Sequence, residues 1–202
     1  NGFFGGLSSC ATVILSQFCG ANDKKAVDNA LHTGFSLSLV LGVLVTALGC
    51  LLGPQVLRWM RTPQECLGMA STYVRIYFAG ALASMVYNME AGILRAMGDS
   101  RRPVLSLIAA CLTNIVMDVL LVVVFRMGVV GVALATVLSQ IVSAVILLVI
   151  LLGEKENPLR LSALRLDGRL LRRILFIGIP AGLQFVTFDL SNTLIQSGIN
   201  SF

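Results

Sequence analysis

Residues 103–152 read PVLSLIAACLTNIVMDVLLVVVFRMGVVGVALATVLSQIVSAVILLVILL, and this stretch decides the fold. It contains two apolar runs, 103–125 and 128–152, separated by a tight turn at Met127 and Gly128. A helix of about 20 residues, rising about 1.5 Å per residue, crosses the hydrocarbon layer of a bilayer. Each run is long enough, so the stretch predicts two antiparallel membrane-spanning helices.

The whole chain has the composition of a membrane protein. Of its 202 residues, 56% are hydrophobic and 12% are charged, and the mean hydropathy is +0.88. A soluble domain carries about twice that charged fraction, so a soluble helical core is the less favoured alternative. Six apolar segments predict an all-α, polytopic transmembrane helix bundle with six membrane-spanning segments: 1–19, 31–53, 69–94, 103–125, 128–152 and 173–200. Gly53-Pro54 is expected to end the second of them.

The basic residues are distributed unevenly between the two sides of the predicted membrane. Eleven lie in the joints of one side: Lys24, Lys25, Arg95, Arg101, Arg102, Lys155, Arg160, Arg165, Arg169, Arg172 and Arg173. The other side has Arg58, Arg61, Arg75 and Arg126. Because cytoplasmic loops are enriched in Lys and Arg, we expect a multi-pass protein of the cell membrane whose more basic loops are cytoplasmic. The net charge of +5 then requires no nucleic-acid partner.

The joint at 153–172 is longer than the others. Its sequence looks amphipathic, which predicts a segment lying along the inner membrane surface as a linker between two bundles. We therefore expect three parts: a lobe at 1–152, the linker at 153–172, and the first helix of a second lobe at 173–202. The chain starts at Asn1 within an apolar run, so we expect it to be part of a longer protein.

Asp118 is the only charged residue between Val104 and Phe125. An aspartate at the centre of a membrane helix costs about 2.5–3.5 kcal/mol, and an ionisable group at that depth indicates a functional site. Asn114 precedes it by four residues and therefore shares its helix face. Counting outward from the turn, Thr136 on the next run lies level with Asp118, and Gln140 lies level with Asn114.

These four side chains predict a binding site for a small cation. Hard oxygen ligands suit Na⁺, and one carboxylate alone suits a proton. Gln140 is expected to support the site rather than to bind the ion. The alternative is a structural role, in which a neutral Asp118 is hydrogen-bonded to Asn114 and Thr136 and joins the helices. Next to these side chains, a stripe of small residues predicts close helix packing: Gly131, Ala135, Ser139 and Ser143.

Other polar residues lie within or near the apolar segments. Gln184, Asp189 and Asn192 in the last segment predict a face that lines a cavity, with interhelical hydrogen bonding as the alternative. Glu90 is expected to form an interfacial ion pair with Arg95, with a role in transport as the less favoured alternative. The single histidine, His32, is expected to be interfacial rather than a metal ligand. The five cysteines lack metal-binding spacing and are expected to be packing residues.

Several motifs together resemble the multidrug and toxic compound extrusion (MATE) transporters. They are GILRAMGDSRRP at 92–103, N-x-x-x-D at 114–118, G-x-x-G-x-A-x-A-T at 128–136, and the GIPAGLQ string at 178–184. The resemblance implies twelve helices in two six-helix lobes, of which this chain would supply helices two to seven. It also implies a cation site that includes Asn114, Asp118 and Thr136, completed by a helix-one aspartate that would lie before Asn1. Some members carry an acidic residue on helix seven, but Asp189 lies one residue later than that position.

This resemblance implies secondary active efflux by a monomer embedded in membrane lipid. Inward movement of Na⁺ or H⁺ would drive the export of an organic solute, often cationic and aromatic, by alternating access, with no cofactor and no enzymatic activity. A lipid-linked oligosaccharide flippase of the same superfamily is the alternative. It would be favoured by several cationic side chains facing the central cavity, which these segments lack. A membrane-embedded enzyme or receptor is less favoured, because it would need a second catalytic carboxylate, a Ser/His pair or metal ligands at matching depth.

Overall fold

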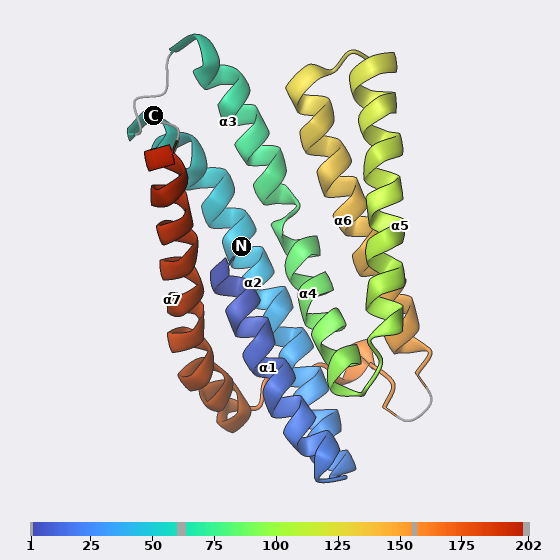
Figure 1. The fold of residues 1–202 in the computed structure, drawn as a ribbon. Helices are drawn as coiled ribbons and strands as arrows, with labels where there is room; N and C mark the ends of the chain where they lie inside the picture. Colours follow the sequence, from blue (N-terminus) through green and yellow to red (C-terminus); the bar gives the residue numbers. More distant parts are fainter. Residues whose placement is uncertain (1, 60–63, 155–156, 200–202) are drawn as a thin grey trace.

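The computed structural model describes residues 2–59, 64–154 and 157–199, and these are helical over most of their length, without a strand. Figure 1 shows the helices as a bundle. The α-helices are α1 Gly2–Gly20, α2 Lys24–Trp59, α3 Gln64–Ala79, α4 Ala81–Ala96, α5 Arg101–Asp118, α6 Gly128–Leu152 and α7 Gly168–Ile199. A π-helix, η1 Val119–Val124, extends α5, and a short 3₁₀-helix, η2 Leu161–Ala163, lies in the linker. The all-α prediction is confirmed.

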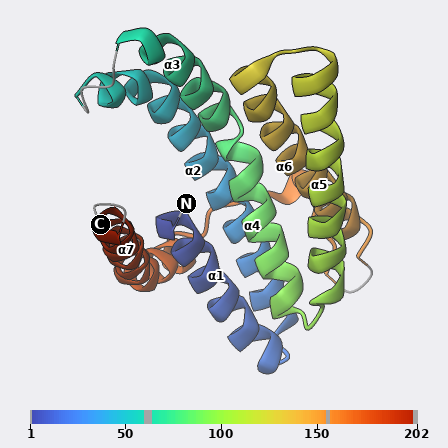
Figure 2. The same ribbon diagram turned by 45° about the horizontal axis from the view of Figure 1, so that its top comes forward.

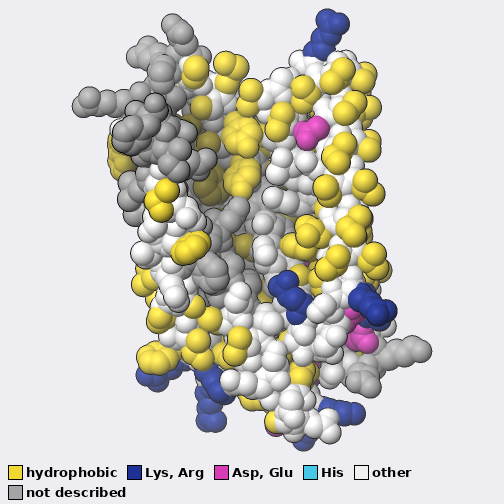
Figure 3. Space-filling view, in the orientation of Figure 1, with side chains coloured by type: hydrophobic (Ala, Val, Ile, Leu, Met, Phe, Trp, Pro, Cys, Tyr) yellow, Lys and Arg dark blue, Asp and Glu magenta, His cyan; other side chains and the backbone are white. Residues whose placement is uncertain are grey.

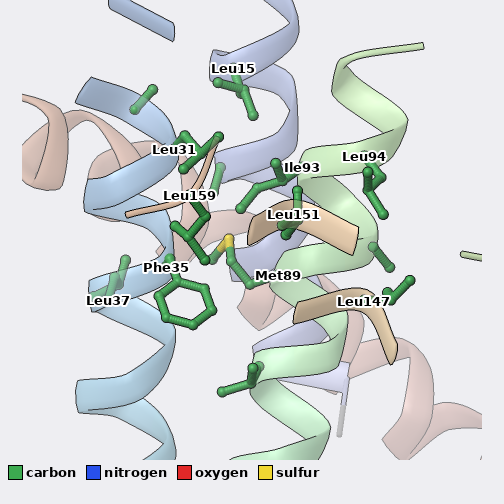
Figure 4. Packing of buried hydrophobic residues seen from close by; sticks show 14 of the residues in the cluster. Leu15, Leu31, Phe35, Leu37, Met89, Ile93, Leu94, Leu147, Leu151 and Leu159 are labelled. Atoms are coloured by element: carbon green, nitrogen blue, oxygen red, sulfur yellow. The ribbon is translucent and has the colours of Figure 1, made fainter. Parts of the chain in front are cut away.

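Helix α4 occupies the middle of the bundle. It packs against α1 and α2 on one side and against α6 on the other. Helices α5 and α6 form an antiparallel hairpin, and α7 packs along α1 at the opposite edge of the molecule (Figures 1 and 2). Buried side chains of α1, α2, α4, α6 and the linker meet in one cluster, which includes Leu15, Leu31, Met89, Leu151 and Leu159 (Figure 4). The bundle therefore has a common core, built around α4.

The outer surface of the bundle is apolar, as expected of helices in lipid. On α5 and η1, large hydrophobic side chains such as Leu105, Val116 and Val123 are more than half exposed. Helices α2, α6, α5 with η1, and residues 168–188 of α7 are each long and apolar enough to cross a membrane. Basic side chains gather at the end of the bundle that carries the connections 21–23, 97–100 and 153–167, which we call the basic end (Figure 3). Four of the six predicted segments therefore correspond to helices of membrane-spanning length among the described residues.

The third predicted segment is interrupted at Gly80, where α3 ends and α4 begins. The Gly80 N–H donates to the carbonyl oxygens of Ile76 and Tyr77, at 3.2 and 3.1 Å, so the backbone stays nearly helical through the break. A Cβ atom at Gly80 would lie 2.7 Å from Val137 Cγ2 on α6. The glycine therefore allows the α3–α4 junction to approach α6 closely.

The expectation that Gly53-Pro54 ends the second segment is wrong. Helix α2 continues through Pro54 to Trp59. Proline removes one backbone hydrogen bond and usually bends a helix without necessarily ending it. The end of α2 leans over together with α3 (Figure 2). Gly49 and Gly53 have no side chains there, so Phe78 and Val74 of α3 pack directly against the α2 backbone.

Candidate cation-binding site

The candidate site lies where α5 changes from an α-helix to a π-helix. Asp118 is the last residue of α5, and η1 follows it directly. The wider turn is closed by a hydrogen bond of 3.0 Å from Phe125 N to Leu120 O. Arg126 and Gly128 both have a positive φ of 54°, so the chain reverses sharply and α6 begins. Single π turns within helices are frequent at functional sites.

The register between α5 and α6 is fixed by a close approach at Gly131. A Cβ atom there would lie 3.2 Å from the Cβ and the carbonyl oxygen of Leu121 in η1. Counting back from this contact, Asp118 lies level with position 134, two residues from Thr136. Two residues correspond to about 3 Å along a helix axis. The pair predicted from the sequence therefore lies within one helical turn of the same depth.

The polar side chains of the site are half-buried on both helices, at Asn114, Asp118, Thr136 and Gln140. Asp118 Oδ1 is buried and has no hydrogen-bond partner in the part of the chain that the structure describes. The Thr136 hydroxyl donates to Val132 O in its own helix, at 2.9 Å, and does not bond to Asp118. The structural alternative, in which Asp118 is hydrogen-bonded to Thr136, is therefore not what this structure contains. A buried acceptor oxygen remains available to a cation or to a proton.

The small residues of α6 are buried as the sequence predicted, at Gly131, Ala135, Ser139 and Ser143. The hydroxyls of Ser139 and Ser143 donate to the carbonyl oxygens of Thr136 and Gln140, at 2.8 and 2.9 Å. Because these donors are satisfied within α6, the stripe can pack against neighbouring helices without a polar cost.

Comparison with known proteins identifies the family. A family model described as MatE matches residues 2–120. The chain belongs to the MatE family. It is 33% identical over 201 residues to the "Probable multidrug resistance protein YpnP" of Bacillus subtilis, and the match covers 99% of this chain and 45% of that protein. The MatE chain therefore spans a little under half the length of this relative.

Solved structures of MATE transporters have the same fold. The chain superposes on an inward-facing conformation of a multidrug resistance MATE family transporter of the MOP superfamily with a TM-score of 0.86 and 29% identity. That match covers 94% of this chain and 43% of the other. An outward-facing conformation of such a transporter gives a TM-score of 0.88 at 28% identity, over 97% of this chain and 44% of the other.

The polar residues of α7 are not brought to the α5–α6 site. Helix α7 packs against α1 and α2. Gln184 and Asn192 are exposed, and the Asp189 side chain lies outside the residues that the structure describes. Their predicted role in lining a cavity of the MatE protein therefore stays a prediction.

The predicted ion pair between Glu90 and Arg95 is wrong. Glu90 is 0% exposed, and neither of its carboxylate oxygens has a hydrogen-bond partner among the described residues, whereas Arg95 is exposed at the basic end. The two residues are five positions apart, which turns their side chains about 140° from each other around the helix. Sequence reasoning missed Glu90 as a buried acid because it treated this spacing as one turn.

His32 is buried, with 1% of its surface exposed, instead of lying at an interface with solvent or lipid. Its Nε2 accepts a hydrogen bond of 3.1 Å from the backbone N–H of Arg160 in the linker. That acceptor role leaves the ring proton on Nδ1, which lies 2.8 Å from the carbonyl oxygen of Asp28. Both ring nitrogens are thus used, and neither is free to bind a metal.

The linker is fastened to α2 by further contacts, which together with His32 we call the linker clasp. Arg165 Nη2 donates to Asp28 Oδ2 at 2.8 Å, and Asn29 Nδ2 donates to Asp167 Oδ2 at 2.7 Å. The backbone N–H of Asp167 lies 3.4 Å from the hydroxyl oxygen of Thr33. Helix α7 starts at Gly168, within the predicted linker, and residues 157–160 and 164–167, on either side of η2, form neither helix nor strand.

Asp167 also caps α7. Its Oδ1 accepts hydrogen bonds from the backbone N–H groups of Arg169 and Leu170, at 2.9 and 3.3 Å, as N-cap aspartates do. The hydrogen bond from Asn29, followed by these two backbone bonds, lowers the pKa of Asp167 below its ordinary value of 3.8. The carboxylate form of Asp167 is therefore part of the clasp.

Proposed function

We propose that this MatE chain forms most of one lobe, and the first helix of the next, in a secondary active exporter of organic solutes. Inward movement of Na⁺ or H⁺ drives the solute outward. The observation that carries the proposal is the unpartnered, buried Oδ1 of Asp118 on a helix hairpin whose other arm presents Thr136 at similar depth. The relative named as a multidrug resistance protein supports the solute class.

The coupling cation is held by oxygen atoms of two adjacent helices. Asp118 supplies the charge, and Asn114 and Thr136 supply neutral oxygens that replace part of a hydration shell. For Na⁺ all three take part, whereas for a proton the Asp118 carboxyl is sufficient. A charge that crosses about 100 mV gains about 2.3 kcal/mol, enough to shift a two-state equilibrium more than tenfold.

The basic end faces the cytoplasm in this proposal, in keeping with the enrichment of Lys and Arg there (Figure 3). The two conformations of MATE transporters compared above are inward-facing and outward-facing, and the chain fits both with similar TM-scores. This supports rocking of nearly rigid lobes, as in other transporters built from two bundles. The contact between α7 and α1 then lies where the lobes meet.

Efflux measured in proteoliposomes tests the proposal. In the full-length protein, we expect Asp118→Asn to keep its thermal midpoint and to lose efflux driven by a Na⁺ or pH gradient. Asp23→Asn is the matched control. It makes the same carboxylate-to-amide change at the basic end, where the exposed Asp23 Oδ1 accepts a 3.1 Å hydrogen bond from the backbone N–H of Ala26. Gradient-driven export by Asp118→Asn at the wild-type rate would remove the carboxylate from the mechanism.

A further inference from the structure

Glu90 is a second acid within the bundle, and it differs from Asp118 in its surroundings. It lies on α4, which is enclosed by α1, α2 and α6, and it is 0% exposed. Among residues 2–59, 64–154 and 157–199, neither Oε1 nor Oε2 has a hydrogen-bond partner. Along the helix it lies about 8 Å from Arg95 at the basic end, whereas Asp118 lies about 25 Å from Arg101 on α5. The two acids are therefore at different depths.

The helices around Glu90 provide no charge that forms an ion pair with it within the described part of the chain. Helix α6 has no titratable side chain, and α1 has only Cys10 and Cys19. The titratable groups on the remaining neighbouring helices and on α4 itself are Lys24, Lys25, Asp28, His32, Cys50 and Arg58 on α2; Glu65, Cys66, Tyr73, Arg75 and Tyr77 on α3; Tyr87 and Arg95 on α4; and Arg101, Arg102, Cys111 and Asp118 on α5. His32 is already engaged at both ring nitrogens.

An ionised carboxylate without a counter-charge or a donor is very costly inside a protein. Glu90 in this arrangement therefore carries its proton. Stability does not explain its presence, because an unpartnered buried polar group destabilises the fold and an apolar side chain of similar size would not. A buried acid that weakens the fold and holds a proton is instead expected of a group that gives the proton up in another state.

A cavity of about 330 Å³ lies at the basic end, and it reaches α4 at Leu94, one helical turn from Glu90. Its lining includes Leu94 and Met97, which follow Glu90 by four and seven residues and so continue the same face of the helix. Leu94 is itself completely buried and separates Glu90 from the cavity along that face. The polar side chains of the cavity include Asp99, Arg102 and Glu154. Arg102 forms ion pairs with Asp99 and with Glu154.

We propose that Glu90 is a second proton-binding carboxyl of this chain and exchanges its proton with this cavity when Leu94 moves aside. The proton passes from the carboxyl group to a water molecule that enters from the cavity, and a carboxylate stays behind on α4. Only the consequence for efflux rests on the proposed function: one further titrating group contributes to the pH dependence of transport. The protonation of Glu90 stands independently of what Asp118 binds.

Infrared spectroscopy of the purified full-length protein tests the protonation directly. A protonated carboxyl has a C=O stretching band that a carboxylate and an amide side chain lack. We expect this band at neutral pH in the wild type and in Asp118→Asn, and its loss in Glu90→Gln. A Glu90→Gln spectrum that keeps the whole band would overturn the proposal. Efflux by Asp118→Asn would instead contradict the proposed function and leave the Glu90 band unchanged.

Two further variants test the path of proton exchange past Leu94 and the destabilisation caused by the buried Glu90 carboxyl. Leu94→Ala is expected to speed hydrogen–deuterium exchange of the Glu90 band at least tenfold. Ile93→Ala is the matched control, because Ile93 leaves α4 in a different direction (Figure 4). Glu90→Met is expected to raise the thermal midpoint and to lower the steepness of log efflux rate against pH by about one, the contribution of a single titrating group. Equal hydrogen–deuterium exchange rates in the two alanine variants, or an unchanged pH profile of efflux in Glu90→Met, would contradict the proposed role of Glu90.

Discussion

The α5–α6 hairpin and the linker clasp differ in how their polar groups are satisfied. In the clasp, the side chains of Asp28, Asn29 and His32 all have partners in the linker or in α2. On the hairpin, Asp118 Oδ1 has no partner within the described ranges of the chain. A satisfied polar group holds elements together, whereas an unsatisfied one has capacity left for a ligand. This difference distinguishes a structural contact, the linker clasp, from a candidate binding site, the hairpin. The following substitutions test that distinction.

The largest effect on stability is expected from breaking the clasp with His32→Ala. The change leaves the Arg160 N–H without an acceptor, leaves the Asp28 carbonyl without the ring donor, and creates a cavity in a buried position. We expect a loss of about 2–4 kcal/mol. The thermal midpoint should fall and trypsin should cut the linker faster. Lys25→Ala, an exposed change on the same helix, should do neither, and unchanged linker proteolysis in His32→Ala would show that the clasp is not a fastening.

On the hairpin, Gly131→Ala should be the most disruptive small change. The new methyl group would lie 3.2 Å from backbone atoms of Leu121, which cannot rotate away. Overpacking of this kind costs about 1–3 kcal/mol. In Gly68→Ala on α3, the added Cβ meets no atom within 4 Å, so this control should gain up to about 1 kcal/mol from helix propensity. If the thermal midpoints of Gly131→Ala and Gly68→Ala moved in the same direction, the close approach of Gly131 to Leu121 would be contradicted.

Thr136→Val separates binding from stability. Its hydroxyl bonds only within α6, so the fold should lose little, but the cation loses one oxygen ligand. We expect about tenfold weaker cation binding, equivalent to about 1.4 kcal/mol, measured by calorimetry on the full-length protein. Thr113→Val is the control, because the Thr113 hydroxyl bonds in the same way to Ala109 O on α5. Equal affinities in the two variants would remove Thr136 from the site.

The smallest effect concerns pH and the carboxylate of the clasp. Because the pKa of Asp167 is lowered in the folded protein, its contribution to stability is present above the ordinary value of 3.8 and is lost as the pH falls through the lower folded value. The linker should therefore become more sensitive to an acid-active protease below about pH 4. Asp167→Asn should remove this increase in proteolysis at acidic pH. An increase of unchanged size in that variant would assign the effect to another titratable group.

The hairpin could be predicted from the sequence because its signals are local. A single aspartate within an apolar run marks the site, and a depth count across a short turn identifies Thr136 to within two residues of the observed register. The clasp could not be predicted in this way. His32 and Arg160 are 128 residues apart, and nothing near either residue indicates the other.

Errors in the sequence analysis also have physical reasons. Pro54 has the residue type that usually ends a helix, but packing of α3 against Gly49 and Gly53 keeps α2 helical beyond it. The sequence favours an interfacial position for Glu90 because an arginine follows it closely. Its burial depends on three helices that surround α4, which no short window of sequence contains.

One carboxylate oxygen of Asp167 accepts a hydrogen bond from Asn29 of α2, and the other accepts from the first turn of α7. A single carboxylate therefore couples the direction of one helix to the direction of another that is separated from it by more than a hundred residues. A tilt of α2 at this end therefore also changes the orientation of the start of α7. Without the Asp167 carboxylate, the two helices could change orientation independently while each kept its own shape.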